Sequence, residues 1–456
     1  MYLLPPNLHD WLPEGHLGQF VSDVVETIDL SAIYEEYEEG DGRGQPPYHP
    51  LMMVKLLVYG YCMGKTSSRK LERATWEEVP YRVLTMDQHP DHDSIAEFRQ
   101  RHLSRLAGLF VQILQLCEEA GLVKLGHVAL DGTKVKANAS KHKAMSYGRM
   151  SEAEIRLEKE VKRLLEEAAH VDAEEDAKYG KGKRGDELPE ELRRQRESRL
   201  KKIREAKAAL EEEAKIKAEA VADEARKKVA ERDRLEEETG KKARGRKVSV
   251  PDVDNAKPEA KAQRNFTDSE SRIMKDGATK EFVQGYNAQI AVDGKSQVIV
   301  ASGVTQETND KRQLIPMLER LKENTGRLPE KISADTGYFS EKNLADEKVK
   351  SVELYIPPER QKHGEADKME AHDTPRDGTV AEKMRAKLKT PEGRSVYKMR
   401  KAIVEPVIGQ IKEARGIRRF WLRGLKKVAA EWDMICLTHN ILKLFRSGWR
   451  PLAVPV

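Results

Sequence analysis

Residues 151–240 divide the strand-like segments of this chain into two groups. The stretch consists largely of Glu, Lys, Arg and Ala and is broken once, at YGKGKRGDELPEE. Apolar residues in its second half recur at three- and four-residue steps, at Ile203, Ala206, Leu210 and Ala214. That spacing predicts a thin seam on one helical face, as in a coiled coil. Any sheet formed by the flanking strands must therefore accommodate an inserted, charged helical hairpin.

The flanking segments predict a mixed α/β sheet. HVALDGTKV begins at His127, before the charged stretch. After it, FVQGYNAQIAVDG and SQVIVASGVTQ alternate in polarity around a short turn, which indicates a β-hairpin. KISADTGYFS and SVELYIPP follow as strands, with helical patterns over DKRQLIPMLERLKENTGRLP and YKMRKAIVEPVIGQIKEARG. This order is typical of a mixed sheet with flanking helices.

The segment from Pro50 to about Leu122 has helical periodicity throughout. Its last helix is expected to begin at Ser94, because Glu97 three residues later would complete a capping box. We therefore predict an all-α N-terminal domain over 1–125 and an α/β domain over 126–446. The charged insertion and a basic linker occupy 141–262, and a tail occupies 447–456.

Bulk properties limit the possible partners. The net charge of +5 permits a polyanionic partner without requiring one. The three cysteines include no Cys-x-x-Cys pair, which fits a reducing compartment. We expect a cytoplasmic protein without membrane spans, because no long apolar run or signal-peptide pattern is present. Gly64-Lys65-Thr66 lacks the spacing of a phosphate-binding loop, so no nucleotide cofactor is expected.

Two interpretations are open for Asp131 in HVALDGTKV. Asp-Gly between β-prone runs is a strong hairpin signal, so Asp131-Gly132 could simply reverse the chain. Alternatively, Asp131 ends an apolar strand, as Asp335 does in KISADTGYFS. Chemistry in α/β sheets gathers at the carboxyl ends of strands, so the two carboxylates could share one rim. Such a pair repels unless a cation or a proton intervenes.

A third carboxylate candidate lies in the last predicted helix. Lys401, Glu405, Ile408 and Lys412 are spaced to share one helical face. Pro406 is expected in the first turn of a helix that restarts there, which would place Glu405 near a helix start. The alternative is an ordinary surface pair of Glu405 with Lys401.

Together, the ordered set of Asp131, Asp335 and a Tyr-x-x-Arg…Glu-x-x-x-x-x-x-Lys helix resembles the DDE transposases of bacterial insertion sequences. The corresponding helix residues are Tyr397, Arg400, Glu405 and Lys412. Four residues separate Arg400 from Glu405 where the family usually has three, and Lys401 stands at the usual spacing. The resemblance extends over roughly 45–125 and 126–445.

The resemblance implies an RNase H-like fold and a transposase that cuts element ends and joins the freed 3′-hydroxyl to target DNA. Asp131, Asp335 and Glu405 would hold two Mg²⁺ ions, replaceable by Mn²⁺, with Asp131 bridging them. Tyr397, Arg400 or Lys401, and Lys412 would hold phosphates. The expected partners are double-stranded DNA at the terminal inverted repeats and the target, and further copies of the chain in a dimer or larger assembly. The protein would then associate with the nucleoid.

Beyond Lys412 the chain is locally basic and includes two aromatic residues. The relevant side chains are Arg415, Arg418, Arg419, Phe420 and Trp421. Phosphate contacts with base stacking would suit DNA binding. The alternative is a solvated helix face with core aromatics. Two other functions also remain open, an RNase H-like endonuclease without joining activity and a non-catalytic DNA-binding or scaffold protein.

Overall fold

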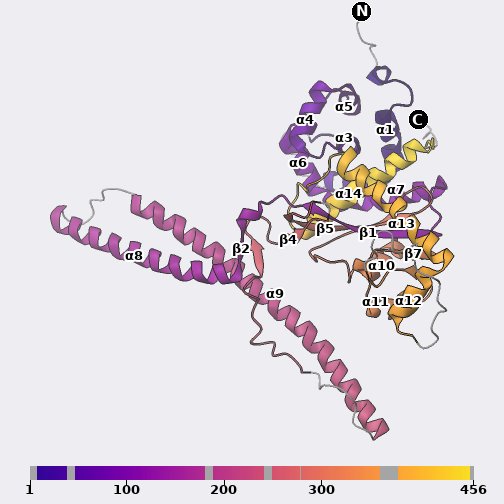
Figure 1. Cartoon of the computed structure of the whole chain (residues 1–456). Coiled ribbons are helices and arrows are strands. Elements are labelled where there is room, and N and C mark those ends of the chain that lie inside the picture. The colour runs from indigo at the N-terminus through magenta and orange to yellow at the C-terminus, as the bar shows by residue number, and fades with distance from the viewer. Residues whose placement is uncertain are drawn as a thin grey trace, which may run out of the picture. The chain divides into compact units, whose positions relative to one another are not determined.

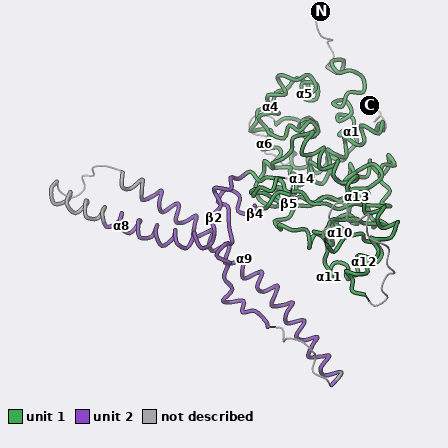
Figure 2. The backbone as a smooth tube through the Cα atoms, in the orientation of Figure 1, with its two compact units in different colours: residues 1–138, 274–456 green, residues 139–273 purple. Residues whose placement is uncertain are grey.

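The structure is a computed structural model that describes residues 8–38, 47–179, 188–240, 249–277, 279–359 and 378–451. The chain divides into two compact units, residues 1–138 with 274–456, and residues 139–273 (Figure 2). The predicted break around 180–187, part of the basic linker (241–248) and the tail end (452–456) lie outside the described residues. No helix in the described ranges is long and apolar enough to cross a membrane.

The N-terminal part of the first unit is helical, as predicted. Its elements are η1 (Leu8–Trp11), α1 (Leu17–Thr27), α2 (Ser31–Glu38), α3 (Pro50–Cys62), α4 (Ser68–Glu77), α5 (Val79–Leu84), α6 (His92–Arg101) and α7 (Leu103–Glu119). The predicted start at Ser94 is wrong. Asp91 caps α6 instead, and its side chain accepts from the Ser94 N–H at 2.8 Å. The helical conformation is interrupted at His102, so two helices, α6 and α7, replace the single helix expected.

The first unit also contains a mixed sheet, which confirms the α/β prediction at that level. Its strands are β1 (His127–Lys136), β4 (Arg272–Lys275), β5 (Phe282–Asp293), β6 (Ile299–Thr305), β7 (Lys331–Ser333) and β8 (Glu353–Tyr355). Their order is β4-β5-β1-β7-β8, and β6 pairs with β5. β1 runs antiparallel to β5 and parallel to β7. The predicted hairpin is present as β5 and β6.

Strand β1 passes straight through Asp131 and Gly132. Asp131 pairs with Ile290 and Gly132 with Gln289, and the antiparallel ladder continues to Lys136. The Asp-Gly pair is therefore no hairpin turn, and Asp131 does not end its strand. A turn signal two residues long was overridden by a complete ladder of pairing with β5.

Helices cover both faces of this sheet (Figure 1). They are α10 (Leu314–Thr325), α11 (Glu341–Ala345), α12 (Val380–Lys389), α13 (Pro391–Gly409) and α14 (Leu425–Arg446), with short helices η3 (Thr336–Tyr338), η4 (Glu347–Val349) and η5 (Gln410–Ala414). On β6, the Ser302 hydroxyl donates to Asp433 of α14 at 2.5 Å. Its neighbour Gly303 faces Met317 of α10. Successive strand residues point to opposite faces, so α14 and α10 pack on opposite sides.

Helix α13 is continuous from Pro391 to Gly409, with Pro406 inside it. The predicted restart of the helix at Pro406 is therefore wrong. Proline has no N–H, so the carbonyl of Ala402 loses its helical donor. The Gln297 side chain supplies a replacement, donating to Ala402 O at 2.8 Å. Beyond Pro406 the helix continues to Gly409 and leads into η5, a π-helical segment.

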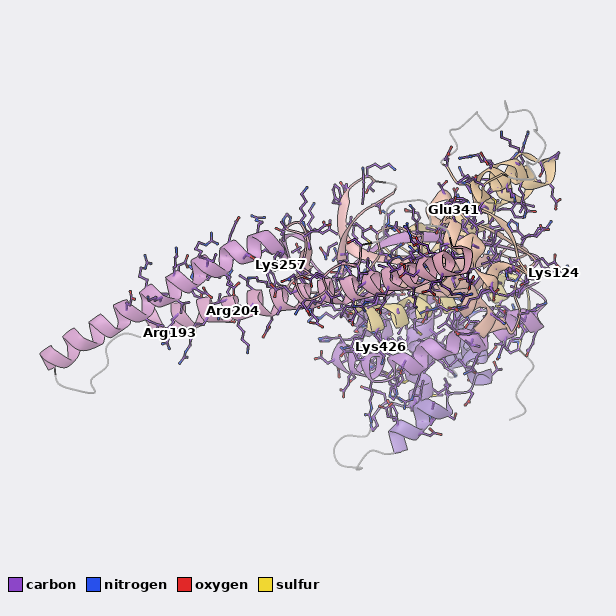
Figure 3. The ribbon with its side chains drawn as sticks, turned by 90° about the horizontal axis from the view of Figure 1, so that it is seen from below. Lys124, Arg193, Arg204, Lys257, Glu341 and Lys426 are labelled. Carbon is purple, nitrogen blue, oxygen red and sulfur yellow. The ribbon has the colours of Figure 1, made fainter. Side chains whose placement is uncertain are left out.

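The second unit contains the predicted helical hairpin. Its elements are η2 (Lys141–Lys143), β2 (Ala144–Ser146), α8 (Tyr147–Tyr179), α9 (Leu188–Thr239) and β3 (Gln263–Asn265). Ile203, Ala206 and Leu210 are buried against Met150 and Leu157, which confirms the seam at these positions. Charged side chains line both helices, among them Arg204, which pairs with Glu154 at 3.1 Å (Figure 3).

Candidate active site

The parallel pairing of β1 with β7 places Asp131 and Asp335 at matching positions. Ala129 pairs with Ser333 in this ladder. Asp131 lies two residues after Ala129, and Asp335 lies two residues after Ser333. β7 ends at Ser333, so Asp335 lies at the edge of the sheet beside the still-continuing β1. This register is compatible with the prediction that the two carboxylates share one rim of the sheet. However, only β7 ends at this rim, whereas β1 continues past it.

Asp131 is held by an arginine from α13. The Arg400 guanidinium (Nη1) donates to Asp131 Oδ2 at 3.2 Å, and the two side chains are 10% and 19% exposed. The other carboxylate oxygen accepts from the Gly132 N–H at 2.8 Å. Burial nevertheless raises the pKa of Asp131 to about 6, with Arg400 opposing the shift. The Asp335 pKa is raised too, by burial and then by the Asp310 charge. Burial thus outweighs the nearby guanidinium in setting the pKa of Asp131.

Arg400, and not Lys401, occupies the site. Lys401 is exposed, whereas Arg400 is buried and its guanidinium lies 5.9 Å from the Tyr397 ring centroid. Glu405 follows Arg400 by five positions, which places it about 140° around the helix. Its side chain is exposed, and no described residue hydrogen-bonds to it. The structure thus brings Asp131, Asp335, Tyr397 and Arg400 together and leaves Glu405 on the outer side of α13.

Lys412 reaches β1 from η5. Its ammonium donates to the carbonyl of Lys134 at 2.7 Å, and burial lowers its pKa. Lys134 itself lies among the acidic residues, with Asp310, Asp335 and Asp131 counteracting the lowering of its pKa by burial. The carboxylates of the site therefore have one lysine and one arginine around them, and Lys412 adds a further cation on β1. This charge pattern suits a phosphodiester with a divalent cation.

A polar group on the α10 face beside the site was not predicted from the sequence. Asp310 Oδ1 accepts from the side-chain amides of Asn287 and Gln289, each at 2.7 Å. Tyr338 donates to the Gln289 side-chain oxygen. Gly132 makes room for this group, because a Cβ there would lie 2.7 Å from Asp310 Oδ1.

One sequence signal could have found this group. Asn287 and Gln289 stand two apart in one strand, so both must point to the same face. Buried amides require partners. Asp310 lies in the connection that follows the hairpin strand β6 and belongs to no periodic pattern, so only the fold reveals it.

The basic segment after Lys412 divides into core and surface residues. Arg415 is buried and donates to the Thr438 hydroxyl at 2.8 Å and to the Ile435 carbonyl at 3.2 Å. Its predicted DNA contact is therefore wrong, because the guanidinium already serves the core. Phe420 is fully buried and packs edge-on to Tyr286 and Trp432, which excludes it from base stacking.

Arg418, Arg419 and Trp421 remain at the surface. Arg418 pairs with Glu413, and Trp421 is 39% exposed with its indole N–H donating to Thr66 at 2.7 Å. A pocket of about 130 Å³ is lined by these three residues with Lys70, Thr66 and Ser67, among others. Its charged lining residues are all cationic, which suits a DNA phosphate.

The carboxylates are not arranged as a closed metal cage. Among the described residues, no three Asp, Glu, His or Cys side chains are grouped tightly enough to hold a metal ion. The chemistry of the group nevertheless fits a hard cation. Its ligand atoms are carboxylate oxygens, which Mg²⁺ prefers. The buried Asn287 Oδ1 beside them has no hydrogen-bond partner.

Comparison with known proteins gives two matches. Residues 6–101 match a family described as Transposase domain (DUF772), and residues 360–445 match the family Transposase DDE domain. The second match includes Tyr397, Arg400, Glu405 and Lys412. No curated protein and no solved structure matches the chain significantly.

Proposed function

Because the chain belongs to the DDE transposases of insertion sequences, we propose that it cuts the ends of its element and joins them to target DNA with a two-cation site on an RNase H-like fold. The proposed reaction has two steps. Water attacks the phosphodiester at the element end, and the freed 3′-hydroxyl then attacks a target phosphodiester. The observation that carries the proposal is the matching position of Asp131 on β1 and of Asp335, two residues beyond the end of the neighbouring β7.

Asp131, Asp335 and Glu405 are the proposed carboxylate ligands and would hold two Mg²⁺ or Mn²⁺ ions. Such a pair supplies activation of the attacking oxygen and stabilisation of the leaving one. Burial of Asp131 beside Arg400 supports this assignment, because added positive charge would favour the ionised form of Asp131. The family match over Glu405 supports its inclusion, although the helix turns it outward in this structure.

The cationic residues of the site would position the DNA backbone. Arg400 lies between Tyr397 and Asp131, so it can move from the carboxylate to a phosphate without leaving the site. Arginine offers a fork of donors to phosphate oxygens. Lys412 is anchored to the β1 backbone at the Lys134 carbonyl and would add a point charge there.

DNA is the partner that transposase domains imply, and the surface cations Arg418 and Arg419 are proposed to contact its backbone. We further propose that the chain acts as a dimer or larger assembly, because two element ends must be brought together. A nuclease without joining activity and a non-catalytic binder are the competing functions.

The test uses the full chain with labelled DNA of the element ends and Mg²⁺. We expect Asp131→Asn to bind the ends as tightly as the wild type and to lose strand cleavage by a factor of about 10³ or more, since it removes a ligand used by both reacting oxygens. Lys401→Gln is the matched control, because that side chain is exposed and outside the site.

Product analysis separates the alternatives. Joined products from the wild type support a transposase, whereas cut but unjoined products indicate a nuclease and uncut DNA indicates a binder. Cleavage by Asp131→Asn at the wild-type rate would remove Asp131 from the site.

A further inference from the structure

Asp310 has one oxygen committed to the protein and one directed toward Asp335. Its Oδ1 accepts both amide donors, from Asn287 and Gln289, whereas Oδ2 accepts no hydrogen bond from any described residue. A Cβ placed on Gly337 would lie 2.9 Å from Asp335 Oδ1 and 3.3 Å from Asp310 Oδ2. The two carboxylates therefore approach one point, left open by a glycine.

Asn287 adds an oxygen that the protein itself does not satisfy. This side chain is fully buried, and its Oδ1 has no partner. Its orientation is fixed, because Nδ2 donates to Asp310 at 2.7 Å and to the Glu307 carbonyl at 3.2 Å. Oδ1 lies 3.0 Å from the position of a Cβ on Gly132, and Asp310 Oδ1 lies 2.7 Å from it. A buried acceptor directed into an acidic group indicates a missing positive partner.

Like charges at this point repel. Among nearby charges, Asp310 has the largest effect on the pKa of Asp335, which it raises, and it also raises the pKa of Asp131. Lys134 is nearby, but burial disfavours its charged form. Asp131 projects toward Arg400 of α13, and the next residue, Gly132, faces Asp310 on the α10 side. Asp335, at the sheet edge, interacts electrostatically with Asp310 on one side of the sheet and with Arg400 on the other.

We propose that Asp310 is a further ligand of the active site and that it shares one divalent cation with Asp335 and the Asn287 amide oxygen. This inference rests on the proposed function and extends its ligand set. Three oxygen atoms, two of them from carboxylates, leave room for waters and a substrate phosphate, as Mg²⁺ requires.

The first test compares Mn²⁺ titrations and thermal unfolding of the full chain and its variants. Asp310→Asn is expected to weaken binding of a Mn²⁺ ion by about tenfold or more. Without metal, the same variant should unfold at a higher temperature than the wild type, because one repelling charge is gone. With Mn²⁺ the order should reverse. Glu307→Gln is the matched control, an acid of the same loop that pairs with Arg312 and should behave as the wild type in both conditions.

A purely structural Asp310 gives a different pattern. If it only accepts the two amide hydrogen bonds, Asp310→Asn lowers the unfolding temperature equally with and without Mn²⁺ and leaves the titration unchanged. That result overturns the inference.

The second test needs no variant. Fe²⁺ bound in place of Mn²⁺ to the wild-type chain, with ascorbate and peroxide, cuts the backbone near the ion. We expect cuts near Asn287, Asp310 and Asp335. Cuts confined to Asp131 and Asp335 overturn the role of Asp310 and leave the proposed function standing. The absence of site-specific cuts overturns both.

Discussion

Gly132 shows how closely the site is fitted around the first strand. A Cβ there would clash with Gln289 Nε2 and lie 2.7 Å from Asp310 Oδ1. Both atoms are held in hydrogen bonds, so neither can withdraw without breaking a contact. Position 132 therefore requires glycine because Gln289 and Asp310 fill the space that a Cβ would occupy. Turn geometry is not the reason.

We therefore expect Gly132→Ala to destabilise the protein by about 1–3 kcal/mol. DNA cleavage should fall further than this stability loss explains, because Asp310 and Gln289 are displaced. Denaturant unfolding and a cleavage assay on the same preparation measure the two effects. Gly108→Ala in α7 is the control, since nothing lies within 4 Å of its added Cβ. Equal behaviour of the two variants would contradict the close fit.

Asp433 provides a pH test that is independent of any metal. Burial raises its pKa from 3.8 to about 6, against the lowering effects of Ser302 and Arg320. The native state therefore holds this proton more tightly than the unfolded chain does. The contribution of Asp433 to stability is fully present below about pH 4 and is lost as the pH rises to about 6.

Relative to Asp433→Asn, the wild type should lose up to about 3 kcal/mol of unfolding free energy over that range. Urea unfolding of both proteins at several pH values between about 4 and 7.5 measures the difference. Parallel curves for the two proteins would show that Asp433 titrates normally.

At the scale of elements, α13 depends on a residue from another part of the chain. Pro406 leaves the Ala402 carbonyl without its helical donor, and Gln297 supplies one. The helix that carries Arg400 is therefore tied at this point to the connection between β5 and β6.

A double-mutant cycle tests this tie. Gln297→Ala should cost about 1 kcal/mol in the wild type and clearly less in a Pro406→Ala background, where the restored backbone N–H can donate to the Ala402 carbonyl. Unfolding free energies of the four proteins give the coupling, expected at about 0.5–1 kcal/mol. Strict additivity would mean that the Gln297 bond does not replace the missing helical one.

The elements differ in how well the sequence predicts them. The β5–β6 hairpin and the seam at Ile203 and Leu210 follow from local periodicity and were predicted correctly. The passage of β1 through Asp131 could not be predicted, because pairing with β5 overrides the local Asp-Gly signal. The course of α13 through Pro406 likewise depends on a side chain more than a hundred residues away.

The site was predictable only in part, for the same reason. Asp131 and Asp335 both follow apolar strand residues, so their proximity follows from general sheet topology. Asp310 lies in a connection without periodicity, and its role depends on three-dimensional contacts alone. The choice between Arg400 and Lys401 was also decided by packing, since both fit a basic position beside the carboxylates.

At the scale of the whole molecule, residues 139–273 form their own compact unit inside the sheet sequence. The strands that border this insertion, β1 and β4, flank β5 on its two sides. Two inter-strand steps separate them by about 10 Å, a gap that a short linker can span.

Replacement of residues 139–271, up to the start of β4, by a Gly/Ser linker of about six residues should therefore leave the first unit folded, because an extended linker of that length reaches about 20 Å. The near-ultraviolet circular dichroism and a cooperative unfolding transition measure this outcome. An aggregated product, or one without a cooperative transition, would show that the first unit requires the insertion. DNA cleavage by a folded product would then reveal whether the hairpin takes part in the reaction.

The insertion also delays the pairing of β1 with β5 during synthesis on the ribosome. β1 is completed at Lys136, and its partner β5 begins only at Phe282. At about 5–20 residues per second, the partner strand follows roughly 7–30 s later. Helices α8 and α9 contact each other as well as β2 and β3 of the same unit, all of which are translated before β5, so they can form within that interval. The strand carrying Asp131 therefore stays unpaired with β5 while the inserted unit is synthesised and folds. Arg400 is nearly the last residue of the site to be translated, so the site is completed only near the end of synthesis.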